Sequence, residues 1–100
     1  MTLFAVWATD AAGALPARER VRPVHRARLR APGPVRVVLA GPTPAPLDAR
    51  MNGTLLIVEA EDLQAVQDFI ERDPYSEAGV YERVEIRPFV CGLGPLAPSS

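Results

Sequence analysis

The chain has 100 residues, which suits one small domain that buries roughly 60–65% of its unfolded surface. Its 11 basic and 12 acidic residues give a net charge of −1, so no overall field draws it toward nucleic acid or a membrane. Every basic residue is an arginine, and the absence of lysine excludes a lysine Schiff base, a pyridoxal-phosphate linkage and a P-loop lysine.

The chain has a single histidine, His25, and a single cysteine, Cys91. One cysteine cannot form an intramolecular disulfide, which fits a reducing compartment and favours a cytoplasmic protein. Because no histidine lies near Cys91 in the sequence, we interpret it as an incidental thiol. These two residues are too few for a zinc site of the usual Cys/His type, and the sequence predicts no metal and no cofactor.

The first predicted element is a strand over Leu3–Ala8, an apolar run whose length and aromatic residues favour burial on both faces. The run is too short for a signal peptide or a membrane span, and we expect no membrane partner. Residues 15–31 contain helix formers and six arginines, interrupted by Pro23. Either the helix kinks at Pro23, or a new helix begins there and His25 lies in its first turn.

Two more strands are predicted in the middle of the chain. Val35–Ala40 is expected to place Val35, Val37 and Leu39 on one face, and Thr54–Val58 is apolar on both faces. Between these strands, residues 43–52 are rich in proline and are expected to form a loop.

The last two elements are a helix and a strand joined by a stiff turn. In Glu61–Arg72 apolar residues recur at helical spacing, and the acidic pair at its start complements the helix dipole. Asp73 precedes a proline and is pushed out of the helical region, so the helix is expected to stop there. Glu82–Pro88 alternates apolar and charged residues as a half-buried strand does. We therefore place one domain at residues 1–90 and a flexible tail at residues 91–100.

The predicted order is β-α-β-β-α-β, the ferredoxin-like pattern, which gives an α+β sandwich with a four-stranded antiparallel sheet. In that fold the first and third strands are central, and both helices cover one face of the sheet. Since both central strands are apolar on both faces, the second face needs a cover that this chain does not supply. Packing against a second sheet is the simplest solution, and the sequence predicts a homodimer.

The topology also predicts a cluster of polar residues at one edge of the sheet. The two helices run antiparallel, so a helix that begins near Pro23 brings His25 toward Asp73. A carboxylate on one ring nitrogen of imidazole fixes its tautomer and makes it a better base. The alternative is a histidine that only caps a helix or packs in the core. The other residues expected at this edge are Trp7, Thr9, Gly41, Tyr75 and Tyr81.

Several stretches carry a resemblance to a known family: Leu3–Ala8, Arg22-Pro23-Val24-His25 with Leu29, Leu39-Ala40-Gly41-Pro42, Gly53–Val58, Asp73-Pro74-Tyr75 and Ala78-Gly79-Val80. Together they resemble the YciI-like family of small α+β barrel proteins, nearly as far as Phe89. The resemblance implies a dimeric α+β barrel with an active site at His25 and Asp73. A similar protein that dehydrochlorinates a chlorinated hydroxyhydroquinone, and the related muconolactone-isomerase-like barrels, imply proton-transfer chemistry on small cyclic or aromatic molecules.

Our main hypothesis is an enzyme without a cofactor that catalyses an elimination or isomerisation. His25 is its general acid or base, Asp73 orients the imidazole, and Arg22 holds an anionic group of the substrate, unless it is merely solvated. The remaining residues assigned to substrate binding are Trp7, Thr9, Gly41 and Tyr75. The alternative is a non-catalytic small-molecule-binding or dimerisation accessory protein of a metabolic pathway.

A third hypothesis is nucleic-acid binding through residues 18–30, which contain six arginines and one glutamate. However, the second predicted helix is acidic and should lie on the same face, so complementary charge on the two helices is a sufficient explanation. No aromatic residues are interleaved with the arginines as a platform for bases. We therefore expect no nucleic-acid partner.

Overall fold

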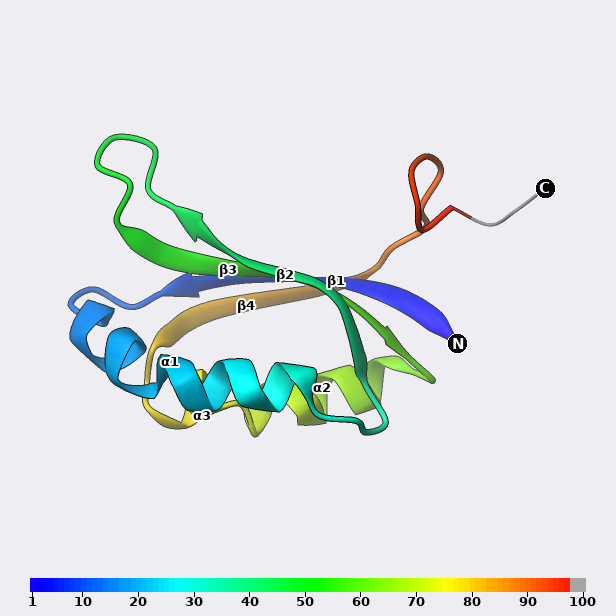
Figure 1. Cartoon of the computed structure of the whole chain (residues 1–100), viewed down its shortest axis with the longest axis horizontal. Helices are drawn as coiled ribbons and strands as arrows, with labels where there is room; N and C mark the ends of the chain where they lie inside the picture. The colour runs from blue at the N-terminus through cyan, green and yellow to red at the C-terminus, as the bar shows by residue number, and fades with distance from the viewer. Residues whose placement is uncertain (98–100) are drawn as a thin grey trace.

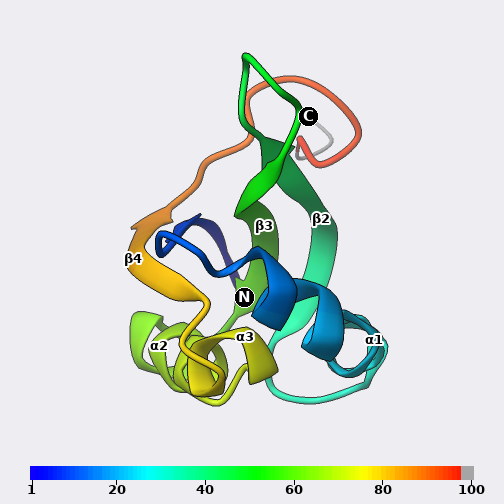
Figure 2. The ribbon, with the colours of Figure 1, turned by 90° about the vertical axis from the view of Figure 1, so that its left-hand side faces the viewer.

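The structure is a computed structural model that describes residues 1–97. Four antiparallel strands form one sheet in the order β2-β3-β1-β4, and all helices lie on one side of it (Figures 1 and 2). The elements are β1 (Thr2–Asp10), α1 (Leu15–Arg30), β2 (Arg36–Pro44), β3 (Met51–Ala60), α2 (Leu63–Glu71), α3 (Pro74–Glu77) and β4 (Tyr81–Pro88). The predicted ferredoxin-like α+β fold is confirmed, with β1 and β3 in the centre.

Strand parity decides which side chains enter the core. β1 pairs with β3 from Thr2 opposite Ala60 to Thr9 opposite Gly53, and with β4 on its other edge. Because successive side chains of a strand point to opposite faces, alternate residues of β1 and β3 pack beneath the helices. The main buried cluster is Phe4, Val6, Val35, Leu56, Val58, Ala60, Val66 and Ile70.

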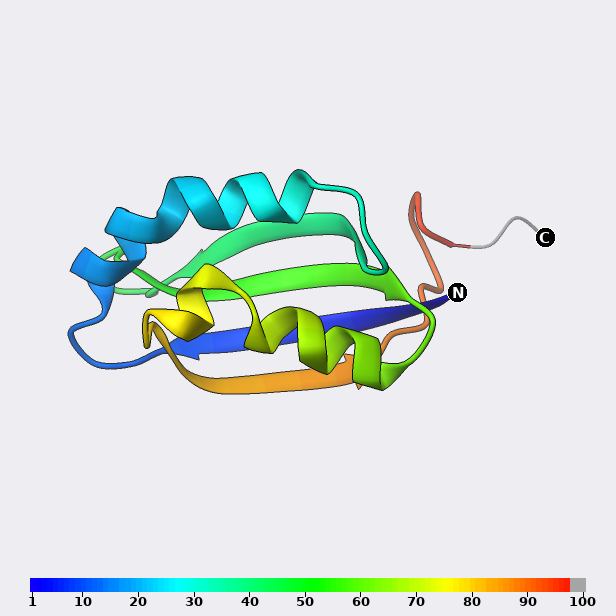
Figure 3. The same ribbon diagram turned by 90° about the horizontal axis from the view of Figure 1, so that it is seen from below.

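The helices run antiparallel across this face, α1 on the β2 side and α2 on the β4 side (Figure 3). Asp62 caps α2, since its side chain accepts a hydrogen bond from the Ala65 N–H at 2.9 Å. Asp73 has the extended backbone expected before a proline (φ −66°, ψ 137°), which ends the helix. The chain then forms the short helix α3, which packs against α1.

Helix α1 is continuous from Leu15 to Arg30, so no new helix begins at Pro23 and His25 lies well inside the helix. Proline costs an interior hydrogen bond, but Pro23 is exposed and the freed carbonyl group can face water. On the opposite side Arg18 and His25, two turns apart, are both buried and held by side-chain bonds. These contacts on either side of the proline favour one helix over two.

Strand β2 differs from its prediction in two ways. A register shift between Val37 and Leu39 adds one residue to β2. Leu39 therefore points to the face of the sheet that none of the described helices covers, called the open face below, and is 58% exposed, while Val35 is buried. The expected loop at residues 43–52 is also shorter, because β2 continues to Pro44 and β3 already begins at Met51. β2 is an edge strand, where prolines are tolerated because one row of its backbone groups has no partner strand.

After β4 the chain leaves the sheet on the side away from the helices (Figure 1). Residues 91–97 form no helix or strand, and the last three residues of the predicted tail lie outside the described residues. The flexibility of this tail stays a prediction. Of the helices described, none is both long and apolar enough to cross a membrane.

Candidate active site

A cavity of about 810 Å³ opens between α1 and β2. Its polar lining includes Arg18, Arg22 and His25 from α1, Thr54 from β3 and the ring of Tyr75 from α3. The two fully buried side chains of α1, Arg18 and His25, are both polar. Since a packed helix normally buries apolar residues on its inner face, this part of α1 is built for something other than core packing.

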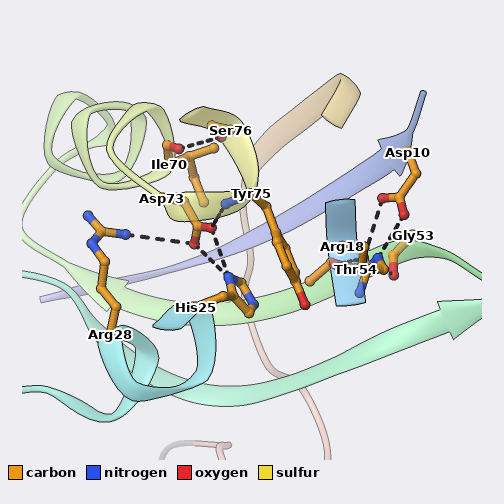
Figure 4. Close-up of polar contacts among 10 residues, drawn as sticks. All are labelled: Asp10, Arg18, His25, Arg28, Gly53, Thr54, Ile70, Asp73, Tyr75 and Ser76. Atoms are coloured by element: carbon orange, nitrogen blue, oxygen red, sulfur yellow. Dashed lines mark hydrogen bonds and ion pairs between the residues drawn. The ribbon is translucent and has the colours of Figure 1, made fainter. Parts of the chain in front are cut away.

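His25 and Asp73 are in direct contact beside this cavity (Figure 4). His25 Nδ1 lies 2.8 Å from Asp73 Oδ1 and 3.0 Å from Oδ2. A carboxylate only accepts hydrogen bonds, so Nδ1 carries the proton and donates it, which leaves Nε2 as the acceptor nitrogen. No hydrogen bond to Nε2 occurs within residues 1–97. The imidazole is therefore arranged as a base at the cavity wall.

Local backbone geometry fixes the Asp73 carboxylate. Asp73 is the N-cap of α3, and its Oδ1 also accepts a hydrogen bond from the Tyr75 N–H at 2.8 Å. The residue is fully buried. The Asp-Pro-Tyr sequence thus ends α2, starts α3 and points the carboxylate back at α1.

Arg28 is a third member of this cluster that the sequence analysis missed. Its Nη1 lies 3.7 Å from Asp73 Oδ2, and its guanidinium stacks 4.2 Å from the centre of the Phe69 ring. Nη1 is buried and has no hydrogen-bond partner in the part of the chain that the structure describes. Arg28 follows His25 by three residues, so the helical i, i+3 spacing was a signal that places both on the same side of α1. Its charge compensates that of the carboxylate.

Tyr75 lies between His25 and Arg18 (Figure 4). Its ring stacks on the imidazole with centroids 3.8 Å apart and an interplanar angle of 16°, and the Arg18 Cζ atom is 4.6 Å from the ring centre. Tyr81 packs edge-on against Tyr75 at 5.7 Å. Burial raises the pKa of both tyrosines, so their phenols stay protonated at neutral pH.

Arg18, which lines the cavity, connects helix α1 to strands β1 and β3. Its Nε donates to Asp10 Oδ2 at 2.7 Å, and its Nη2 donates to the Gly53 carbonyl oxygen at 2.8 Å and to the Thr54 hydroxyl. Burial by itself lowers the pKa of Arg18, but the hydrogen bond and charge of Asp10 outweigh it and raise the pKa. The guanidinium is therefore a fixed, permanent cation.

The structure brings most of the predicted site residues together. His25, Arg22, Gly41 and Tyr75 line the cavity, and Asp73 lies directly behind His25. Among residues 1–97, no three histidine, cysteine, aspartate or glutamate side chains are grouped as metal ligands would be.

Trp7 and Thr9 lie elsewhere. Both belong to β1, where they alternate with the buried residues Val6 and Ala8, so their side chains point to the open face of the sheet. The prediction used the position of the strand end, which lies close to the cavity, but strand parity turns these two side chains away from it. Trp7 is 58% exposed.

Comparison with known proteins places this chain in a family. The model of the YCII-related domain matches residues 2–90. The chain belongs to this family. It is 42% identical over 93 residues to the protein YciI of Escherichia coli, covering 87% of this chain and 95% of that protein. An uncharacterized protein of Haemophilus influenzae is 39% identical over 92 residues, 86% of this chain and 94% of that one.

Solved structures with the same fold include one enzyme. The 5-chloro-2-hydroxyhydroquinone dehydrochlorinase of Burkholderia phenoliruptrix, in complex with 2,5-dihydroxybenzoquinone, is 30% identical, with a TM-score of 0.76 over 90% of this chain and 95% of that chain. An uncharacterized NIPSNAP domain protein of Burkholderia xenovorans is 15% identical with a TM-score of 0.54, covering 99% of this chain and 100% of that chain, and it shows likeness of fold alone.

Proposed function

We propose that this YCII-related protein is an enzyme without a cofactor in which His25 transfers a proton on a small cyclic or aromatic metabolite, in an elimination or isomerisation. The observation that carries the proposal is the bond from His25 Nδ1 to the buried Asp73 carboxylate, which leaves Nε2 as a base at a cavity wall. The similar dehydrochlorinase supports this class of reaction.

Each residue has a distinct role in this mechanism. His25 Nε2 takes a proton from the substrate and later returns it to a carbon atom or to the leaving group. Asp73 is a positioning residue that holds the tautomer and stabilises the imidazolium when it forms. Arg28 keeps the buried carboxylate charge-compensated when His25 is neutral. Arg22, which lines the cavity, attracts an anionic group of the substrate.

Hydrogen–deuterium exchange into candidate substrates tests the proposal. The protein is incubated in D₂O with chlorinated hydroxyquinols, phenols and small lactones, and deuterium on carbon is followed by mass spectrometry. We expect exchange in at least one of these compounds, and His25→Gln should slow it by roughly 10²- to 10⁴-fold because the general base is removed. Arg20→Gln removes an exposed charge of the same helix outside the cavity and should leave the rate unchanged.

The imidazole tautomer gives a second, independent readout. Since His25 is the only histidine, its two ring nitrogens give unambiguous signals in a ¹H–¹⁵N correlation spectrum. We expect the Nδ1–H tautomer in the neutral ring and loss of this preference in Asp73→Asn. A compound that binds beside His25 with no His25-dependent exchange in any candidate would favour the alternative, a non-catalytic small-molecule-binding or accessory protein.

We also propose that the protein acts as a homodimer. The open face of the sheet carries Trp7, Leu39 and Leu55, which are 58%, 58% and 39% exposed. β4 adds Arg83, Glu85 and Arg87 to the same face, so both signs of charge are present at its edge. A second copy, turned by a twofold axis, covers the apolar strands and can pair these charges. A cytoplasmic location stays a prediction that rests on the single cysteine.

A further inference from the structure

Two side chains that line the cavity, those of Arg18 and Tyr75, have hydrogen-bond donors that no described residue accepts from. Arg18 is 5% exposed and Tyr75 is 1% exposed, and both line the cavity. A buried donor without a partner destabilises the folded protein, and more so when the group is charged. Buried polar groups of this kind normally have a hydrogen-bond partner, which can be a ligand or an ordered water molecule.

The contacts of the Arg18 guanidinium leave one of its three nitrogens without a hydrogen bond. Its recorded bonds to Asp10, Gly53 and Thr54 use Nε and Nη2 only. Nη1 makes no hydrogen bond within residues 1–97, and it is not among the fully enclosed atoms that lack a partner. Nη1 therefore keeps some accessible surface, and Arg18 is one of the residues that line the cavity. Because the other two nitrogens fix the group, Nη1 is a pre-oriented cationic donor.

The Tyr75 hydroxyl is placed in a similar way. The ring is clamped between the His25 imidazole and the Arg18 guanidinium, and the hydroxyl points away from Asp73 (Figure 4). No hydrogen bond from this hydroxyl to residues 1–97 is present. Burial raises the pKa of the phenol, so it carries its proton across the neutral range and can donate it.

We propose that Arg18 and Tyr75 form a receptor for an anionic oxygen of the ligand, and that the ligand is a small planar ring whose phenol or ketone oxygen carries negative charge. The inference rests on the proposed function and specifies its substrate class. When His25 Nε2 takes a proton from the carbon next to a ring carbonyl, the C–H electron pair forms a carbon–carbon double bond, and the carbonyl π pair moves onto oxygen. The receptor donates two hydrogen bonds to that oxygen, where charge develops.

The charge lining the cavity agrees with an anionic ligand. Arg22 and Arg26, one turn apart on α1, line it on either side of His25, and the acidic side chain in the lining is Glu19. The Arg18 charge is already paired with Asp10 and the Arg36 charge with Glu59, so Arg22, Arg26 and Arg30 supply the excess positive charge. The competing explanation is that Arg18 only ties β1, α1 and β3 together.

Binding of 4-nitrophenol distinguishes the two explanations. The phenolate absorbs visible light and 4-nitroanisole is its neutral methyl ether, so titration of the full chain above and below the phenol's ionisation separates charge from shape. We expect the phenolate to bind at least about tenfold more tightly than the ether. Tyr75→Phe keeps the stacked ring and should cost the phenolate roughly tenfold in affinity while leaving the ether unaffected.

Arg18 needs a paired substitution, because removing it alone leaves the buried Asp10 without its cation. Asp10→Asn combined with Arg18→Gln removes both charges and should abolish the preference for phenolate over ether. Arg20→Gln is the matched control: it removes one positive charge from the same helix outside the cavity lining, and the preference should persist.

The inference is overturned if the wild-type protein binds phenolate and ether equally, if it binds neither, or if Tyr75→Phe leaves phenolate affinity unchanged. The deuterium-exchange test keeps the two proposals apart. His25-dependent exchange without a phenolate preference removes the anion receptor and leaves the base in place. A phenolate preference carried by Tyr75, without His25-dependent exchange, supports the receptor in a binding protein and removes the proposed enzyme.

Discussion

The two faces of the sheet both carry large apolar residues, but one face is buried beneath the helices and the other is exposed. On the helix-covered face Phe4, Val6 and Leu56 are at most 4% exposed, whereas on the other face Trp7 and Leu39 are each 58% exposed. Val6 and Trp7 are neighbours on β1, one residue apart. The covered face is a core at one end and a polar site at the other, while the open face has an apolar surface that nothing in residues 1–97 covers.

The difference shows that burial alone does not identify function here. The polar residues of the candidate site, Arg18, His25 and Asp73, are buried on the helix-covered side of the sheet. Exclusion of water there strengthens each hydrogen bond and ion pair. The open face is apolar without being part of the core of one chain, which is the signature of a contact surface. The proposed dimer contact on this face and the proposed catalytic role of the cavity can therefore be tested separately.

Leu56 and Leu55 provide the largest contrast, because they are neighbours on β3 that face opposite sides. Leu56 is 1% exposed and Leu55 is 39% exposed. Leu56→Ala should lower the free energy of unfolding by about 2–5 kcal/mol, since it leaves a cavity in the core. Leu55→Ala should cost under about 1 kcal/mol at protein concentrations where the chain is monomeric. Urea denaturation measures both, and equal losses would contradict the assignment of faces.

Leu39→Glu tests the open face as a contact between two copies. Placing a carboxylate in an apolar contact should raise the dimer dissociation constant at least roughly 30-fold, as loss of a hot-spot residue of about 2 kcal/mol does. Analytical ultracentrifugation reads the constant, and far-UV circular dichroism should show an unchanged fold. Leu47→Glu, at a fully exposed position between β2 and β3, is the control. A wild-type chain that stays monomeric at high concentration would rule out the homodimer.

Alkaline pH gives the smallest effect, and it acts on the covered face. Burial raises the pKa of Tyr75 and Tyr81 in the folded protein, so the unfolded chain ionises first, near pH 10. The stabilisation is complete below pH 10 and is lost as the pH rises above it, by about 1.4 kcal/mol per pH unit for each tyrosine. These are the only two tyrosines, so tyrosinate absorbance reports them directly. Tyr81→Phe should halve the slope, and tyrosinate that appears near pH 10 without unfolding would contradict burial.

Much of the fold and half of the site follow from local sequence. The four strands, the two long helices and their order come from hydrophobic periodicity and from breakers such as the Asp73-Pro74 step, where steric exclusion acts between adjacent residues. The contact between His25 and Asp73 was also predicted. It was predicted for a helix that begins at Pro23, however, whereas His25 makes the contact from the interior of α1.

What the sequence could not determine depends on contacts between distant residues. Trp7 alternates with the buried residues of β1, so it points to the open face, which no helix of residues 1–97 covers. A single added residue in β2 turns Leu39 to the open face as well. In the sequence, Arg18 and Arg28 do not differ from the other arginines of their helix. In the structure, Arg18 pairs with Asp10 of β1, and Arg28 lies next to Asp73 in the turn before α3. Periodicity thus determined the elements and their order in this protein. Only packing decided which arginines are buried and what the cavity can bind, because the cost of burying a charge depends on partners that lie far away in the chain.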